Sequence, residues 1–308
     1  MRVLLVFSAF FCYNGSDSIY YITKKPKGKD MFSFLFDFFQ KNAIDCYAPI
    51  PLSACTVTRR YLLERNGIGE SGTVVMIALP YYTHACDDPA RNLSAYATSK
   101  DYHGFFRDFF DRLIHELEAR FPEHRFAGFA DHSPIDERDA AVRAGLGVIG
   151  KNGLLLTERY SSYVFLGELI TDAQLDCEAH PIRTCEDCGA CQKACPIDAC
   201  GGCLSALTQK KGELTEAETQ NILKYQSVWG CDICQEVCPY TKRAKKAGTI
   251  YSPVSYFHEH TIPVLTTELL DRMSDEEFSA RAFSWRGRET IRRNLLLFEV
   301  AKKGAQEC

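Results

Sequence analysis

The sequence has no run of 18 or more apolar residues, so no segment has the hydropathy of a membrane-spanning helix. It also has no strong excess of charge. The net charge of −4 and the isoelectric point of about 6.1 exclude nucleic-acid binding through overall charge, although not through a local basic face. Low-complexity tracts are absent, and 46% of the 308 residues are hydrophobic, which excludes a disordered chain and predicts one large or two smaller domains.

Residues 1–30 match an export signal poorly. A short apolar run follows Arg2, but no small residue precedes Cys12 and there is no twin-arginine pair. Residues 24–30 have the composition of a linker and Met31 opens a helical pattern, so translation starting at Met31 is an alternative. We interpret residues 1–30 as an N-terminal extension and expect a cytoplasmic protein.

Helical and strand patterns alternate between residues 31 and 176. Apolar side chains recur at i, i+3 and i+4 over residues 102–121, which predicts an amphipathic helix. A continuous apolar and β-branched run over residues 73–79 predicts a buried strand. Further helices are expected over residues 31–42, 58–66 and 137–144, and further strands over residues 125–130 and 163–170. The alternation predicts an α/β or α+β layer domain, with Asp131 at the kind of strand end where ligands collect in open sheets.

The cysteines mark a second unit. Ten of the 15 lie between Cys177 and Cys238, and the long cysteine-poor stretches elsewhere argue against a secreted disulfide framework. We therefore expect an α/β cofactor-binding domain over residues 31–176, a cysteine-rich module over residues 177–248 and a short helical segment over residues 249–308.

The cysteine spacing is typical of bacterial ferredoxins. Cys185 opens a run of the form C-x2-C-x2-C-x3-C-P, in which three thiolates surround one cuboidal cluster and the fourth ligates another. A second run, C-x2-C-x3-C-P, ends at Cys238 and lacks its first member, because Val228 stands at that position. The runs supply seven of the eight ligands that two [4Fe–4S] clusters need. Cys203 is the expected eighth ligand, and Cys200 is the alternative.

The exchange of the fourth cysteine between clusters predicts two ligand sets. One cluster takes Cys185, Cys188, Cys191 and Cys238, and the other takes Cys195, Cys203, Cys231 and Cys234. Zinc is the alternative occupant, but zinc sites usually show two separated C-x2-C pairs. The spacing therefore favours a ferredoxin-like double [4Fe–4S] module and one-electron chemistry in a reducing compartment.

Motifs around this module resemble those of the epoxyqueuosine reductase family. They are Asp131-His-Ser-Pro134, Arg143-Ala-Gly-Leu-Gly-Val-Ile-Gly-Lys-Asn152 and Phe165-Leu-Gly-Glu168, followed at once by the first cysteine run. Matching segments also begin at Leu93, Asp101, Cys203 and Gly230, and one more lies around Arg292-Arg-Asn294. The resemblance extends from about residue 73 to residue 300.

The resemblance implies an oxidoreductase that reduces the epoxide of epoxyqueuosine in tRNA to queuosine, the last step of queuosine biosynthesis. It implies cobalamin as a cofactor, electrons that pass through two [4Fe–4S] clusters to it, and Asp131 of the D-x-x-P motif as the proton donor. The positions that correspond to cobalamin contacts in the family are Ala97, Tyr102, His103, Asn152, Leu155 and Leu166.

The chain departs from the family's pattern in three respects. The segment between Cys195 and Cys203 is short, the region before residue 70 hardly matches, and the optional C-terminal helical repeats are absent. Two other interpretations therefore stay open: another corrinoid and iron–sulfur reductase that acts on a small molecule, or a two-cluster electron carrier. The first would typically carry a twin-arginine signal, and the second would not need the D-x-x-P and G-K-N motifs.

Removing an epoxide oxygen to leave an alkene takes two electrons and two protons. A carboxylic acid can supply a proton only if burial or nearby negative charge raises its pKa. We expect Asp131, beside apolar Phe129, to be such an acid; a helix cap or an ion pair with Arg143 is the structural alternative. His103 is expected to stack or hydrogen-bond near the corrin, or simply to begin a helix, because D-x-H-G differs from the D-x-H-x-x-G of corrinoid enzymes that ligate cobalt through histidine.

Gly145, Gly147 and Gly150 follow a predicted helix rather than a strand, so they do not form a dinucleotide-binding loop. Their spacing instead predicts a close approach of a cofactor or of the chain to the backbone.

Two basic stretches are candidates for tRNA contact. Residues 281–303 hold seven Lys or Arg residues, and Lys242, Arg243, Lys245 and Lys246 form a second group. Basic side chains neutralise phosphates, and Trp285 or Tyr240 could stack on a base; a solvated helix face is the alternative. We also expect a monomer that receives electrons from a donor such as a ferredoxin or flavodoxin.

Overall fold

The computed structural model describes residues 30–197 and 202–306. The N-terminal extension expected over residues 1–30 therefore lies outside the described residues except for Asp30, and so does Cys200. Within the described ranges, no helix combines the length and apolar character that a bilayer span requires.

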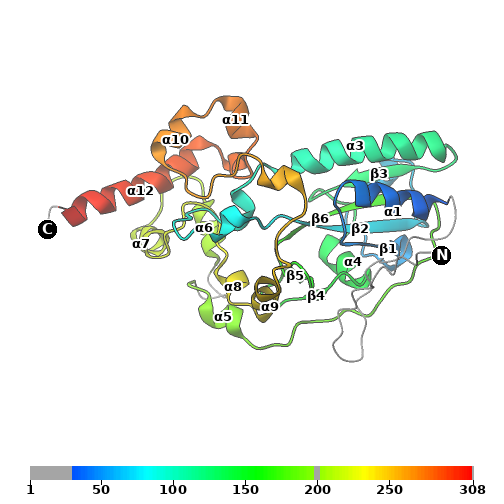
Figure 1. Ribbon diagram of the computed structural model, residues 1–308, viewed down its shortest axis with the longest axis horizontal. Helices are drawn as coiled ribbons and strands as arrows, with labels where there is room; N and C mark the ends of the chain where they lie inside the picture. Colours follow the sequence, from blue (N-terminus) through cyan, green and yellow to red (C-terminus); the bar gives the residue numbers. More distant parts are fainter. Residues whose placement is uncertain (1–29, 198–201, 307–308) are drawn as a thin grey trace, which may run out of the picture.

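A four-stranded sheet forms the centre of the first half of the chain (Figure 1). Its order is β1 (Tyr47–Pro51), β2 (Thr73–Pro80), β6 (Val164–Thr171) and β3 (Phe126–Phe129), and every neighbouring pair is antiparallel. A separate antiparallel ribbon joins β4 (Val148–Ile149) to β5 (Leu155–Leu156). The mixed α/β class is confirmed, but placing Asp131 by analogy with open parallel sheets is wrong, because no strand pair in this sheet is parallel.

Helices cover both faces of the sheet. On one face α1 (Met31–Lys41) and α3 (Tyr102–Arg120) bury phenylalanines against the odd-numbered residues of β2. On the other face α4 (Glu137–Arg143) and α2 (Arg60–Arg65) pack on its even-numbered residues. The alternation of β2 between two cores explains why its sequence is apolar throughout.

The second half of the chain is helical. Figure 1 shows α10, α11 and α12 at the opposite end of the molecule from α1, with α5, α8 and α9 gathered near the β4–β5 ribbon. The bounds of these helices are α5 (Ala190–Ala194), α6 (Leu204–Thr208), α7 (Glu216–Lys224), α8 (Ile233–Glu236), α9 (Pro239–Ala247), α10 (Thr267–Arg272), α11 (Asp275–Ser279) and α12 (Arg288–Gln306). Short 3₁₀ turns cover Leu52–Ala54, His84–Asp87, Ala95–Ala97, Ser255–His258 and Ser284–Arg286.

The segment between β2 and α3 joins the two halves. Leu93 and Ala97 pack in one core with Trp229 and with residues of α10, α11 and α12. A buried ion pair lies beside this core: Arg91 Nη1 is 2.6 Å from Asp232 Oδ2, and the two side chains are 12% and 3% exposed. Asp232 follows Cys231 in the chain, so the pair ties the second cysteine run to the sheet domain.

One glycine of β6 tests the packing of α3 on the sheet. A Cβ on Gly167 would lie 2.5 Å from the ring of buried Phe106 on α3. We expect Gly167→Ala to lower the free energy of unfolding by about 1–3 kcal/mol, because overpacking displaces the ring. Denaturant unfolding measures this. Gly69→Ala, with no atom within 4 Å of its Cβ, is the control; equal losses in both variants would contradict the packing.

Candidate functional site

Asp131 lies in a sharp turn just after the edge strand β3. Its φ of +63° is in the left-handed region, which aspartate tolerates better than most residues. The backbone N–H of Asp131 donates to Glu137 Oε1 at 3.2 Å, which holds the turn against the first turn of α4. Strained backbone of this kind concentrates at functional sites.

The Asp131 carboxylate is hydrogen-bonded to two side chains at the start of α3. The Tyr102 hydroxyl donates to Asp131 Oδ2, and His103 Nε2 lies 3.1 Å from the same oxygen. His103 Nδ1 is in turn 2.8 Å from Oδ1 of Asp101, the residue that caps α3. Arg143 pairs with Asp139 instead, and Asp136 caps α4, so both structural alternatives for Asp131 are wrong.

The charge state of Asp131 differs from the one expected from sequence. The hydrogen bond from His103 lowers the pKa of Asp131 and outweighs the effect of burial. Hydrogen bonds to Asp101 and Asp131 raise the pKa of His103 to about 10. The expected rise in the pKa of Asp131 is therefore wrong, because the imidazole of His103 neutralises its charge and carries the proton.

An open cleft of about 460 Å³ lies beside Asp131. Its wall includes Tyr102 and, from β6, Val164, Phe165 and Leu166, with Arg59 and Arg138 at its polar side. The Tyr102 ring stacks on Phe165 with centroids 3.9 Å apart and on His103 with centroids 4.2 Å apart. The side chains of Asp131 and His103 are 64% and 51% exposed, so both are accessible to a ligand.

Three of the six expected cobalamin contacts belong to this cleft or to its hydrogen-bond network, namely Tyr102, His103 and Leu166. Ala97 and Leu155 are buried in the protein core, and neither lines the cleft. Asn152 lines a different pocket, among the cysteines. The assignment of all six as cofactor contacts stays a prediction.

Two further acids near Asp131 were missed in the sequence. Glu137, on the first turn of α4, lines the cleft, and Glu168, in the middle of β6, is fully buried. Burial and the charge of Asp131 raise the pKa of Glu137 to about 7. Burial and the neighbouring Glu137 raise the pKa of Glu168 well above its usual range. The sequence signal that could have identified Glu168 is a single acidic residue within an otherwise apolar strand.

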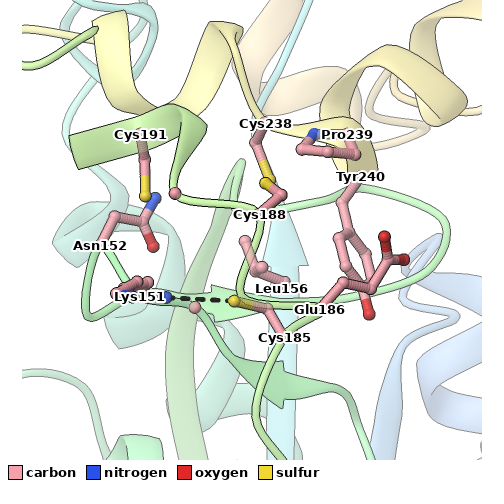
Figure 2. A pocket seen from close by; sticks show the side chains of 12 residues that line it. Lys151, Asn152, Leu156, Cys185, Glu186, Cys188, Cys191, Cys238, Pro239 and Tyr240 are labelled. Atoms are coloured by element: carbon pink, nitrogen blue, oxygen red, sulfur yellow. Dashed lines mark hydrogen bonds between the residues drawn. The ribbon is translucent and has the colours of Figure 1, made fainter. Parts of the chain in front are cut away.

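Four cysteines from both runs line one small pocket (Figure 2). They are Cys185, Cys188, Cys191 and Cys238. The backbone N–H of Lys151 donates to Cys185 Sγ at 3.3 Å, and the side chain of Asn152 points toward Cys191. The buried Nδ2 of Asn152 has no hydrogen-bond partner among the described residues. This set is the one that the spacing predicted for the first cluster.

Three of the other four cysteines are electrostatic neighbours. Burial, together with the charges of Asp232, Cys234 and Cys203, raises the pKa of the Cys231 thiol to about 12. Burial likewise raises the pKa of the Cys234 thiol to about 11, with contributions from Cys203 and Cys191. Cys203 therefore lies close enough to Cys231 and Cys234 to affect their pKa values, and its role as the eighth ligand stays a prediction. Cys195 is half-buried, and its thiol donates to the Ile197 carbonyl at 2.8 Å.

The spacing of these thiols bears on the kind of metal site. Among the residues that the structure describes, no three Cys, His, Asp or Glu side chains gather closely enough for one metal ion. Four thiolates around a cuboidal cluster stand farther apart than four thiolates around one tetrahedral ion. The choice between a cluster and zinc at this pocket stays a prediction from the cysteine spacing.

The glycine-rich stretch after α4 attaches the first cysteine to the sheet domain. A Cβ on Gly147 would lie 2.3 Å from the Leu156 carbonyl oxygen, so only glycine allows the β4–β5 ribbon to close. The Cys185 N–H then donates to the Ile149 carbonyl at 2.9 Å. These glycines serve a close approach of the chain, one of the two expected roles.

Most of the basic side chains expected to contact tRNA are occupied within the protein. Arg281 is buried and donates to the carbonyls of Thr98 and His260, and Arg288, Arg292 and Arg293 are also bonded to neighbouring groups. Tyr240 lines the cysteine pocket and is half-buried, and its role as a base-stacking residue stays a prediction. Trp285 remains 57% exposed with the Arg286 guanidinium 3.8 Å from its ring centroid.

Lys242 and Lys246 are exposed on α9. The side chains of Lys302 and Lys303 lie outside the described residues.

Comparisons with known proteins agree on one family. A family model described as "Epoxyqueuosine reductase QueG, DUF1730" matches residues 66–132. The epoxyqueuosine reductase of Lactococcus garvieae is 31% identical over 259 residues, which cover 76% of this chain and 70% of that protein. The structure of epoxyqueuosine reductase from Streptococcus thermophilus has the same fold, with a TM-score of 0.70 and 24% identity over 87% of this chain and 80% of that chain. A crystal structure of epoxyqueuosine reductase with an epoxyqueuosine-modified tRNA-Tyr stem loop gives a TM-score of 0.67 at 26% identity, covering 86% and 80%.

The pairing at Asp131 predicts a histidine that is protonated at neutral pH. We expect the pKa of His103 near 10 and expect Asp131→Asn to lower it, because one of its two hydrogen bonds to a carboxylate is lost. Because the pairing raises this pKa in the folded chain, its contribution to stability is complete below about pH 6.5 and is lost as pH rises through about 10. NMR titration of the imidazole measures the pKa, with His103→Gln to assign the signal. An unchanged value in Asp131→Asn would contradict the network.

Proposed function

Because the chain belongs to the epoxyqueuosine reductase family, we propose a route by which its own residues reduce the epoxide of epoxyqueuosine in tRNA to give queuosine. The epoxide oxygen leaves as water and an alkene forms, so the reaction consumes two electrons and two protons. The observation that carries the proposal is the open cleft in which Asp131 and protonated His103 share a hydrogen bond. A carrier of electrons alone would not need this cleft.

Asp131 delivers the first proton. In the resting cleft Asp131 is ionised and His103 holds the proton 3.1 Å away. As negative charge develops on the epoxide oxygen, the proton moves from His103 Nε2 to Asp131 Oδ2 and from the carboxyl to that oxygen. The Tyr102 hydroxyl keeps the carboxylate oriented throughout, since burial and Asp131 raise the pKa of Tyr102 and hold it neutral. Two groups thus act as one acid.

The eight cysteines would hold two [4Fe–4S] clusters, which supply electrons one at a time. Cys185, Cys188, Cys191 and Cys238 would hold one cluster, and Cys195, Cys203, Cys231 and Cys234 would hold the other. The pocket lined by the first four cysteines, the orphaned Asn152 amide and the Lys151 N–H all fit a sulfur-rich anion at this place. Electrons enter from a small donor protein such as a ferredoxin or flavodoxin.

A corrinoid fits the cleft at Asp131. Tyr102, Phe165 and Leu166 give it a flat apolar wall, and His103 and Asp131 present polar atoms at its edge. Tyr102, His103 and Leu166 would contact the cofactor from the cleft, and Asn152 would do so from the side of the cysteine pocket. Ala97 and Leu155 are buried and would support the neighbouring contact residues from behind. When bound, cobalamin would supply the redox-active cobalt chemistry needed to reduce the carbon–oxygen bonds.

The tRNA anticodon stem loop is the substrate, as the co-crystal of a relative with such a stem loop supports. On this chain the exposed Trp285–Arg286 pair and the exposed Lys242 and Lys246 are the groups that remain available for stacking and for phosphates. The buried Arg281 is excluded from this role.

The crossed ligand sets predict a specific pattern of iron loss. We expect Cys203→Ser to lower the iron content by about half, because one of two clusters loses a ligand. Cys238→Ser should remove the other cluster, although it lies in the second run. Iron and sulfide analysis after anaerobic purification measures both variants, with Cys177→Ser as the control. Full iron in Cys203→Ser would assign the eighth ligand to another residue.

The reaction itself is tested in a bacterium that lacks its own epoxyqueuosine reductase. With this gene supplied and cobalamin in the medium, we expect nucleoside mass spectrometry of tRNA to show queuosine in place of epoxyqueuosine. Asp131→Asn should reduce the conversion by about 10²-fold or more, because the acid is lost. Epoxyqueuosine that persists with an iron- and cobalt-loaded wild-type protein would reject the substrate, and normal conversion by Asp131→Asn would reject the acid.

A further inference from the structure

The reaction needs two protons, but the Asp131–His103 pair stores only one. Asp131 is ionised in the resting cleft, and the single acidic proton of the pair lies on His103. Once this proton has been transferred, the oxygen has become a hydroxyl group. A second acid has to protonate that hydroxyl so that it can leave as water and the alkene can form.

Glu137 and Glu168 lie where a second acid is needed. Glu137 lines the same cleft as Asp131, and its Oε1 accepts the Asp131 backbone N–H at 3.2 Å. Glu168 pairs with Phe129 across the β6–β3 ladder, two residues before Asp131. Its position on β6 matches those of Leu166 and Ile170, so its side chain points to the α4 face of the sheet.

The hydrogen bonds of Glu168 are incomplete unless it holds a proton. The Ser133 hydroxyl donates to Oε1, while Oε2 is buried without a donor among the described residues. A fully buried carboxylate with one bare oxygen is costly, whereas a carboxyl group can donate from that oxygen to a neighbouring acid. The neighbouring acid is Glu137, whose carboxyl group is hydrogen-bonded to that of Glu168, so two carboxyl groups share one site.

The other charged groups around this site do not neutralise it. Asp131 and Asp136 add negative charge from the β3–α4 turn, and Cys55 approaches from the segment before α2. Arg59 and Arg138 also line the cleft, but Arg59 Nη1 donates to the Ser133 carbonyl at 2.9 Å and Arg138 Nη1 donates to the Gly153 carbonyl at 3.0 Å. His103 is committed to Asp101 and Asp131. An acid pair without a counter-cation retains a proton at neutral pH.

We infer that Glu137 and Glu168 store the second proton of the reaction and that Glu137 delivers it from the wall of the cleft. This inference rests on the proposed function. Two electrons arrive from the donor protein and both carbon–oxygen bonds of the epoxide break. The first proton comes from the Asp131–His103 pair and the second from Glu137, so that the oxygen leaves as water. Glu168 passes its proton to Glu137, and solvent at the open cleft recharges the pair.

Infrared spectroscopy tests the stored proton without any turnover. We expect the loaded wild-type chain to show the carbonyl band of a protonated carboxyl group at neutral pH, and expect that band to vanish in Glu168→Gln and to shift in Glu137→Gln. Glu118→Gln, on the exposed face of α3, is the matched control and should leave the band unchanged. A wild-type spectrum without the band at neutral pH would overturn the inference.

The rate of queuosine formation tests the delivery. In single turnovers with reduced enzyme and modified stem loop, we expect the wild-type rate to fall as the pH rises above about 7, where Glu137 loses its proton. Glu137→Gln should react about 10²-fold more slowly and lose this alkaline limb. Glu168→Gln keeps the volume of the side chain and should also lose the limb, with unchanged iron content and melting temperature as evidence of intact folding.

The outcomes separate the two proposals. Wild-type enzyme that forms no queuosine rejects the proposed function, whatever the infrared spectra show. Normal queuosine formation by Glu137→Gln, with the rate within about twofold of wild type and the alkaline limb intact, overturns only the present inference. A slower rate in Glu137→Gln with the alkaline limb retained would show that Glu137 only positions the Asp131 turn. That result would also overturn the present inference.

Discussion

The buried ion pair between Arg91 and Asp232 fixes the cysteine module to the sheet domain. Asp232 accepts from Arg91 and from the Ala95 N–H, both at 2.6 Å, and the Gln235 amide donates to its other oxygen at 3.1 Å. Breaking such a pair by removing one partner typically costs about 3–5 kcal/mol, because the remaining charge stays buried and unpaired. The carboxylate follows Cys231, and the segment it holds leads directly into the start of α3. The second cysteine run and the segment that leads to the side chains that hold Asp131 are thus positioned by the same contact.

The carboxyl groups of the cleft are not equally paired with a positively charged group. Three carboxyl groups, Asp131, Glu137 and Glu168, lie within one short stretch of the fold, and one imidazole faces them. His103 is within reach of Asp131 alone, so Asp131 ionises and its charge in turn helps to keep the two glutamates protonated. Environments that push the pKa values of neighbouring acids apart are how one site obtains both an anion and an acid.

The sequence predicted the long amphipathic helix, the buried central strands and the grouping of the cysteines. Each of these features depends only on the spacing of residues that are close together in the sequence. It missed β1, whose Pro49 and Pro51 argue against a strand and are tolerated because β1 is an edge of the sheet. Strand direction was also beyond reach, since it depends on which strands pair across the chain. The charge of Asp131 could not be predicted because its partner His103 lies 28 residues away in sequence. The burial of Arg281 could not be predicted either, because no local sequence pattern shows that a basic residue is buried.

The helix between the third and fourth cysteines of the first run, α5, contains no buried side chain. Around it, Cys188 is exposed and Cys185, Cys191 and Cys195 are only partly covered. If the cysteines bind the proposed clusters, a loop with so little core of its own would draw its folding energy from ligation rather than from packing. Iron supply would then affect how much of this protein a cell retains as well as how active it is. A chain made during iron starvation would present an open cysteine loop to proteases, and its abundance would fall before its catalytic residues were affected.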